Sequence, residues 1–420
     1  MTNIPQAQQA ISLNFIGDTM FVSGVDGVQS YDVSNPRDPQ LLGVLPMYIW
    51  ENEDVDVDPA RHLLFISRDP RGFTSPATSG ATFPYGMLQV IDVSNPRAMI
   101  EISQIVLGSG HTSTCVAKCR WIWTGGPFAN AQTQPSWHGR PIMSTDLSDP
   151  MNPKACPHPI NLGNNDGLTD YSHDVQVDAA GVAWVSGFGS VRGFWVTGRH
   201  RDPVDGRVKT ATGCDPIPYA GGGTELGRGG GIMHNAGRNL QAKVDGRRGD
   251  VLWVTEENLT TACATTGRFS TYDLRGSYQG QGFKNIAKTK FRLKQLGTWS
   301  IEKQPGSNGC DSAHYFSDRG DQVLAYAFYG QGTRFLDVSN PRRPRQVGYF
   351  RPDDASTWAP YWHKGYVFIA DRARGIDIVR FTGKGGGRSS TVVAPPLDRR
   401  TPVRFTASPT RLGWMCAVPA

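Results

Sequence analysis

The chain has 420 residues with a net charge of +6, and its 49 glycines and 29 prolines supply turns at high density. This charge is modest, and the arginine clusters lie in turns and tails, so we expect no nucleic-acid partner. No stretch approaches the roughly 18 apolar residues of a membrane helix, and the N-terminal residues lack the basic and apolar regions of a secretion signal. We therefore expect no membrane span and leave the compartment open, since a leader could precede the numbered chain.

The composition predicts short strands and no helices. Glycine or proline interrupts nearly every window in which helical spacing could be sought. The 11 tryptophans, 13 tyrosines and 18 phenylalanines suit pleated, half-buried surfaces. We therefore expect an all-β protein.

One turn phrase recurs along the chain. Asp-Val-Ser-Asn-Pro-Arg stands at residues 32–37, 92–97 and 337–342, and looser copies begin at Asp146 and Asp273. Each copy follows a short apolar run. Asp, Asn and Ser side chains bond to nearby backbone in turns, and proline fixes the next corner. We therefore predict that this phrase is structural, at the periphery of a repeated unit, and not catalytic.

The repeat contains a strand, a polar turn, an apolar second strand, a Gly-rich turn and a third strand that ends in the turn phrase. Units of about 40 to 60 residues with three or four strands are typical of propeller blades. The apolar second strands are residues 20–23, 64–67, 121–125, 182–186, 251–255, 323–327 and 367–370. We predict a seven-bladed β-propeller over residues 1–382 and a flexible tail over residues 383–420. We also expect the chain before residue 13 to add an outer strand to the last blade and close the ring.

The strands Leu88-Gln-Val-Ile-Asp-Val93 and Arg334-Phe-Leu-Asp-Val338, each followed by Ser-Asn-Pro, resemble those of the LVIVD-repeat β-propeller proteins. The resemblance covers roughly residues 13–381 and is specific for the fold. It implies a protein that is often exported, but it implies no reaction and carries no catalytic motif.

Histidine is scarce, with nine in the chain, and four of them recur at one place in the repeat. His173 lies eleven residues before Trp184 of its second strand, and His111 and His314 lie ten before Trp121 and Leu324. His234 precedes its second strand by more, because residues 237–249 look like a longer hairpin. Unit two has Glu53 at this position. The innermost strands of a propeller line its channel, so we expect these side chains to ring one mouth of it.

Three interpretations of this ring remain open. In the first, His111, His173, His234 and His314 bind one transition-metal ion (Zn, Fe, Cu or Ni), with Asp170, Asp174 and Asp311 as outer acceptors. In the second, His173 or His314 acts as general acid or base beside Glu53 without a metal. In the third, the histidines bond neighbouring blades and plug the channel. No nucleotide cofactor is expected, because no Gly-Lys-Ser/Thr follows the glycine runs.

Other residues are candidates for contact with a small-molecule substrate. The channel position of unit seven falls at Thr357 or Trp358, and Trp358 could form a substrate wall or belong to the core. Asp174, Asp311 and Glu225 are the polar candidates, and Glu225 lies between two glycine runs that lead to His234. This insertion, residues 199–232, and a second one, residues 68–86, are each interpreted as a lid or channel wall or as a surface loop. Glu256-Glu-Asn could bind a cation or a basic substrate, or form a solvated turn.

Seven cysteines leave the redox state open. Cys115 and Cys119 flank a tight turn and could bridge across it. Cys156, Cys214, Cys263 and Cys310 could supply two more bridges, and scattered buried thiols are the alternative.

The sequence supports two classes of function. The first is a small-molecule enzyme at the channel mouth that uses His173, His314 and Glu53, with or without a metal. Its chemistry could be hydrolytic, of the lyase or cyclase type, or oxidative. The second is a binding or scaffold propeller that presents its loops to a protein, glycan or surface partner. The recurring histidines favour the enzyme, although the fold alone implies neither.

Overall fold

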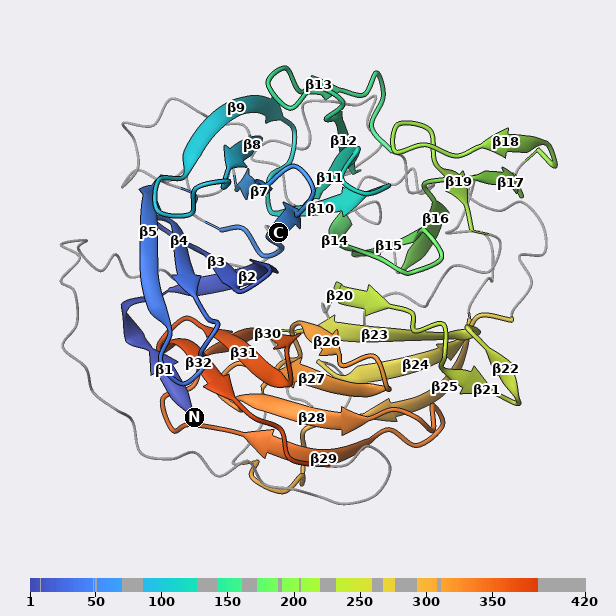
Figure 1. Cartoon of the computed structure of the whole chain (residues 1–420). Coiled ribbons are helices and arrows are strands. Elements are labelled where there is room, and N and C mark those ends of the chain that lie inside the picture. The colour runs from blue at the N-terminus through green and yellow to red at the C-terminus, as the bar shows by residue number, and fades with distance from the viewer. Residues whose placement is uncertain are drawn as a thin grey trace.

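Seven four-stranded antiparallel sheets are arranged in a ring around a central channel (Figure 1). The computed structural model describes residues 1–7, 9–47, 49, 51–69, 86–126, 142–160, 172–187, 191–203, 205–219, 232–258, 267–275, 293–307 and 311–383. The predicted all-β, seven-bladed propeller is therefore confirmed. In the described part of the chain no helix is long and apolar enough to cross a membrane.

Each blade runs from an inner strand at the channel to an outer strand at the rim. Blade one contains β2 (Ala10–Ile16), β3 (Thr19–Gly24), β4 (Gly27–Asp32) and β5 (Gln40–Pro46). Blade two contains β6 (Asp56–Asp58), β7 (Leu63–Arg68), β8 (Gly86–Asp92) and β9 (Ile100–Leu107). Blade three contains β10 (Thr112–Val116), β11 (Trp121–Gly125), β12 (Met143–Asp146) and β13 (Lys154–Ala155). Blade four contains β14 (Ser172–Val177), β15 (Val182–Gly187), β16 (Arg192–Trp195) and β19 (Ile217–Pro218).

The remaining blades repeat this order. Blade five contains β20 (Ile232–Gly237), β23 (Val251–Glu257), β24 (Phe269–Asp273) and β25 (Lys294–Trp299). Blade six contains β26 (Phe316–Asp318), β27 (Val323–Ala327), β28 (Thr333–Asp337) and β29 (Arg345–Phe350). Blade seven contains β30 (Thr357–His363), β31 (Tyr366–Asp371), β32 (Gly375–Val379) and, from the other end of the chain, β1 (Thr2–Ile4). All seven apolar segments identified in the sequence are second strands.

The N-terminal residues close the ring, as predicted. Strand β1 pairs antiparallel with β32, with Asn3 opposite Asp377, and the Asn3 amide donates to the Asp377 carboxylate at 2.9 Å. A short 3-10 helix, η1 (Pro5–Ala7), then leads into blade one. Closure in this way covers the edge of β32, which would otherwise expose unpaired backbone groups. The predicted tail from residue 384 onward lies outside the described residues, so its flexibility stays a prediction.

The recurring turn phrase has the local role that its residue types predict. The Asp32 carboxylate accepts from the Ser34 amide at 2.8 Å, and the Asp92 carboxylate accepts in the same way from Ser94. The amide of Arg37 donates to the Asn35 side chain at 3.2 Å. These bonds satisfy turn backbone that no strand pairs. The three full copies lie between the third and fourth strands of blades one, two and six, away from the innermost strands.

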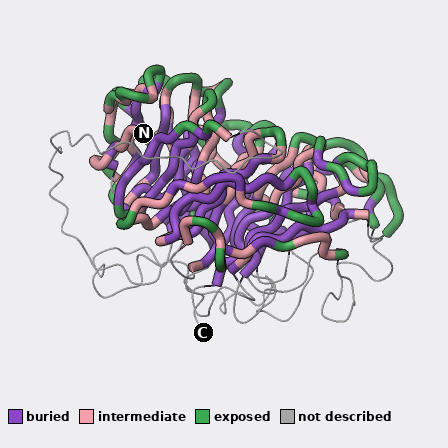
Figure 2. Tube along the Cα trace, turned by 90° about the horizontal axis from the view of Figure 1, so that it is seen from below, coloured by how far each residue is buried: buried purple, intermediate pink, exposed green. Residues whose placement is uncertain are grey.

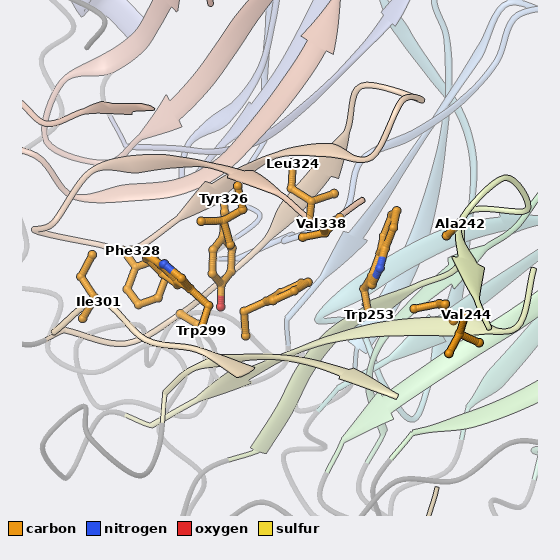
Figure 3. Close-up of a cluster of buried hydrophobic side chains, with 13 residues drawn as sticks. Ala242, Val244, Trp253, Trp299, Ile301, Leu324, Tyr326, Phe328 and Val338 are labelled. Carbon is orange, nitrogen blue, oxygen red and sulfur yellow. The ribbon is translucent and has the colours of Figure 1, made fainter. Parts of the chain in front are cut away.

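The core lies between neighbouring blades, where the second strands pack face to face. Figure 2 shows buried residues running through the middle of the disc, with exposed residues at its outer turns. The cluster between blades five and six is rich in aromatic residues and centres on Tyr326, whose ring lies 4.7 Å from Phe328 and 5.7 Å from Phe269 (Figure 3).

The insertion at residues 199–232 is more ordered than a simple loop. It contains an extra hairpin, β17 (Arg199–Arg201) with β18 (Val208–Thr210), followed by β19, the outer strand of blade four. The sequence did not reveal β19, because a two-residue edge strand shows no periodicity. The longer hairpin in unit five is present as β21 (Lys243–Val244) and β22 (Arg247–Arg248). Residues 220–231 and 70–85 lie outside the described residues.

Two of the possible disulfides form. Cys115 bonds to Cys119 across the turn between β10 and β11, and Cys156 bonds to Cys214. The second bridge links the outer part of blade three to the segment before β19 in blade four. Cys263 and Cys310 lie outside the described residues.

Candidate metal centre

Four histidines and one glutamate from five blades meet at one end of the channel. His173 lies in β14 and His234 in β20, while His111 and His314 lie immediately before β10 and two residues before β26. Glu53 lies three residues before β6. All five side chains are fully buried. The five residues singled out by their position in the repeat are therefore brought together.

Register shifts in the inner strands help to aim these side chains. The pairing of β14 with β15 slips between Ser172 and Asp174, and the extra residue is His173. A similar slip between Met233 and Ala236 includes His234. In a regular strand consecutive side chains point to opposite faces, and a bulge relaxes this alternation. His173 and Asp174 can therefore both reach residues of neighbouring blades.

The imidazoles converge on the Glu53 carboxylate through their Nε2 atoms. Glu53 Oε2 lies 3.2 Å from His111 Nε2, 3.6 Å from His173 Nε2 and 3.3 Å from His234 Nε2. Glu53 Oε1 lies 3.4 Å from His314 Nε2. The Nε2 atoms of His111 and His173 are 3.0 Å apart. Four nitrogens and a carboxylate thus share one small, buried volume.

These separations fit atoms that share a cation. Two ligand atoms that each lie about 2.1 Å from a metal ion are about 3.0 Å apart at a right angle and about 3.4 Å apart at the tetrahedral angle. The observed separations run from 3.0 to 3.6 Å, and the longest corresponds to an angle of about 120° at the ion. The nitrogen and oxygen donors of Glu53, His173 and His234 lie within 4.8 Å of one another. The same holds for His234, Glu257 and His314, and for Glu51, Asp69 and His111.

Two of the imidazoles are oriented by acceptors behind them. His111 Nδ1 lies 2.9 Å from Asp69 Oδ2, and Glu51 Oε2 is 3.5 Å from the same nitrogen. His314 Nδ1 donates to the Trp358 carbonyl oxygen at 2.8 Å. With Nδ1 bonded to an acceptor, Nε2 faces Glu53 and can bind a metal once it has released its proton, and an acceptor behind Nδ1 is the usual arrangement for metal-bound histidines.

The electrostatics keep the two central imidazoles neutral. Burial, with His314 next, lowers the pKa of His234 to about 3, and burial with the neighbouring His234 holds the pKa of His173 well below its usual value. Burial alone would raise the pKa of Glu53, but His111 and His314 hold it well below its usual range. A neutral imidazole offers a lone pair, so His173 and His234 are ready to bind a metal near pH 7.

Asp69 and Glu51 were not singled out from the sequence, whereas Glu257 belongs to the segment for which cation binding was one interpretation. Asp69 follows β7, Glu257 ends β23 and Glu51 lies two residues before Glu53; all are buried. The pairing of Met233 with Glu256 and of Ile232 with Glu257 shows that the end of a second strand lies beside the start of the first. An acidic residue at the end of a second strand is therefore the sequence feature that could have identified Asp69 and Glu257 as site residues. Glu256 and Glu257 are buried, so the alternative of a solvated turn is wrong.

Tyr329 contacts both Glu257 and His314. Its hydroxyl donates to the Glu257 carboxylate, and its ring lies 5.0 Å from that of His314. Its backbone φ of 38° is in the left-handed region, which a bulky side chain rarely adopts. Strain of this kind persists where surrounding structure enforces it and often accompanies functional sites. Trp358 also packs on His314, with ring centroids 4.8 Å apart.

Asp174 and Asp311 contact groups other than the imidazoles that they were expected to orient. The Asp174 carboxylate accepts from the Asn235 amide at 2.7 Å and the Tyr315 hydroxyl at 3.1 Å, and the Asp311 carboxylate accepts from the Gly330 amide at 2.9 Å. The acceptors that orient His111 and His314 are Asp69 and the Trp358 backbone, in place of Asp174 and Asp311. Asp170 and Glu225 lie outside the described residues.

The Glu257 carboxylate makes the stability of the metal-free protein depend on pH. Burial raises its pKa to about 7, from 4.5 when exposed. Below about pH 4.5 the group is protonated in both the folded and the unfolded protein and costs no stability. As the pH rises through 7 the buried carboxylate must ionise, and at pH 8 this lowers the free energy of unfolding by about 3 kcal/mol. We expect Glu257→Gln to stabilise the chelator-treated protein by up to about 3 kcal/mol at pH 8 and to have little effect at pH 5. Denaturant unfolding at both pH values, beside the exposed-site control Glu101→Gln, measures this, and an equal effect at both would contradict it.

Comparison with known proteins agrees with the repeat structure. The family model of the LVIVD repeat matches residues 85–106, which include β8 and most of β9. No curated protein matches the chain. Among solved structures, the chain is similar to Sqt1 of Saccharomyces cerevisiae, with 10% identity and a TM-score of 0.46 over 88% of this chain and 82% of that one. From the repeat match and its own sheet topology, the chain is a seven-bladed β-propeller that carries LVIVD-repeat sequence.

Proposed function

We propose that this protein is a metal-dependent enzyme that acts on a small molecule at the histidine end of its channel. His111, His173, His234 and His314, together with Glu53, would bind one transition-metal ion. The observation that carries the proposal is the convergence of four Nε2 atoms on one buried carboxylate at 3.2 to 3.6 Å. Perturbed, buried ionisable groups of this kind are more typical of active sites than of scaffolds.

The donor set favours iron or copper over zinc. Catalytic zinc usually has three protein ligands and closed zinc sites have four, whereas four imidazoles and a carboxylate can supply five. Imidazole suits iron, copper and nickel, which accept more than four ligands. When bound, such an ion would supply redox or Lewis-acid chemistry to a substrate. Oxidative chemistry is thus the leading class, ahead of hydrolysis and lyase-type reactions.

The surrounding residues have separate roles in this proposal. Asp69 and the Trp358 carbonyl hold the imidazoles of His111 and His314 in the orientation that presents Nε2. Glu257, with its pKa raised by burial to about 7, can hold or release a proton 3.8 Å from His234 Nε2. Full burial shields the ring from bulk water, which strengthens these interactions.

Elemental analysis of full-length, untagged protein tests the proposal. We expect about one equivalent of iron, copper or nickel in the wild type, its loss in His173→Ala and its retention in His62→Ala, whose side chain is exposed on a turn. Wild-type protein that takes up no transition metal, even after incubation with Fe(II) or Cu(II), would contradict the proposal. Equal metal content in wild type and His173→Ala would also contradict it.

The alternative, a scaffold propeller without catalysis, has less support. A scaffold needs no buried cluster of ionisable groups, and burial of such groups costs several kcal/mol each unless they are compensated. The two functions differ in one measurement. In a scaffold, His173→Ala would leave metal content and partner binding unchanged.

A further inference from the structure

A second feature of the channel is a cavity of about 490 Å³ that inner strands of all seven blades line. Asp54, Asn235 and Tyr315 line it, and each directly follows a ring residue: Glu53, His234 and His314. The cavity therefore begins one residue further along the inner strands than the ring. Its volume is in the range of small-molecule sites, about 300 to 1,000 Å³.

The described residues that line the cavity include more acidic than basic side chains. Asp54, Asp56, Asp178 and Asp318 are acidic, and Arg238 is the one basic residue in this part of the wall. Arg238 Nε donates to Asp178 at 2.7 Å, so these two charges compensate each other. The carboxylates of Asp54, Asp56 and Asp318 have no basic partner among the described residues. An occupant with positive charge would complement them.

One neutral acceptor and one buried carboxylate also favour an occupant with positive charge and N–H donors. Asn235 is 1% exposed, and its Oδ1 has no donor in the described part of the chain, although its Nδ2 donates to Asp174 at 2.7 Å. Tyr315 donates its hydroxyl to the same carboxylate at 3.1 Å. Asp174 is fully buried behind these lining residues, and no basic side chain among the described residues pairs with it. An N–H donor in the cavity would satisfy Asn235 Oδ1.

The walls also contain aromatic rings. Tyr315, Phe316, Tyr361 and Trp253 line the cavity. Aromatic faces attract organic cations, and an alkyl chain between cationic groups gains from contact with apolar ring surface. The groupings in the described residues that are tight enough for a bare metal ion all belong to the histidine end. The aspartates of the cavity are more widely spread, which suits a larger cation.

We propose that this cavity binds a small aliphatic ammonium compound, with its N–H groups on Asp54, Asp318 and Asn235 and its alkyl part against the aromatic wall. The site does not depend on a metal at the histidine end, so either proposal can fail without the other. A ligand here would lie beside the ring, separated from it by Tyr315, whose ring centroid is 4.9 Å from that of His234.

Titration calorimetry with 1,4-diaminobutane on the full-length protein tests this site. We expect one binding event in the wild type and no binding of 1,4-butanediol, which has the same length and no charge. Asp54→Asn and Asp318→Asn keep the side-chain shape, and we expect each to weaken diamine binding about 30-fold or more. Asp353→Asn, at a fully exposed carboxylate outside the cavity, should bind like the wild type.

Each outcome decides the proposal. Circular dichroism and the melting temperature establish that both variants are folded, and one folded variant is sufficient for the comparison. Weaker binding in Asp54→Asn or Asp318→Asn, with normal binding in Asp353→Asn, supports the site. Absence of diamine binding, equal binding of the diol, or equal affinity in all variants overturns it. Binding of CaCl2 alone, lost in the same variants, would also overturn it in favour of an inorganic cation.

Discussion

Replacement of His234 by alanine will weaken metal binding at least about 100-fold and leave the metal-free protein folded. Neither ring nitrogen of His234 has a hydrogen bond in the described part of the chain, although Nε2 lies 3.3 Å from Glu53 Oε2. The imidazole instead packs at a tilt between those of His173 and His314, at centroid distances of 4.2 and 4.0 Å. Its removal therefore leaves no hydrogen-bond partner unsatisfied. Competition with a chromophoric chelator measures the affinity, and denaturant unfolding of chelator-treated protein measures stability.

His158→Ala is the matched control, because His158 is exposed whereas every ring residue is buried. Unchanged metal affinity in His234→Ala would contradict the ligand role. A loss of more than about 2 kcal/mol in the metal-free protein would instead indicate a packing role. His111→Ala separates these effects less clearly, because it also removes the partner of the buried Asp69 carboxylate.

Tyr326→Ala will destabilise the propeller by about 3 to 5 kcal/mol, whereas Tyr326→Phe will stabilise it by about 1 kcal/mol. Tyr326 is fully buried between blades five and six, with Trp299, Phe269 and Phe328 around its ring (Figure 3). Truncation to alanine would open a cavity among these rings. The hydroxyl, however, has no hydrogen-bond partner among the described residues, so phenylalanine removes a buried polar atom at no cost in packing.

Equilibrium unfolding of the two variants beside the wild type measures both effects. Because the two variants are expected to change the free energy of unfolding in opposite directions, they separate the contribution of ring packing from that of the hydroxyl. Destabilisation of Tyr326→Phe by 1 kcal/mol or more would show that the hydroxyl does have a partner. A loss below about 1 kcal/mol in Tyr326→Ala would show that the interface between blades five and six collapses around the change.

The blade repeat could be predicted because its signals are local. The apolar second strand near Val182 and the bond from the Ser94 amide to Asp92 each depend on residues close in sequence. The ring position could be predicted for the same reason, since His173 and His314 lie at similar distances from their second strands. The short β19 could not be predicted in this way, because two residues are too few to show a strand periodicity.

By itself, the sequence determined the all-β class, the seven blades, closure by the N-terminus and the convergence of four histidines with Glu53. Periodicity, turn chemistry and spacing from the nearest strand are properties of neighbouring residues. Only the tertiary structure decided which carboxylates join the ring: Asp69 reaches His111 across 42 positions, and Glu257 accepts from Tyr329 across 72. It also placed Asp174 against Asn235 and Tyr315, on the cavity side. Contacts between blades depend on register shifts and on closure of the ring, and no local pattern encodes them.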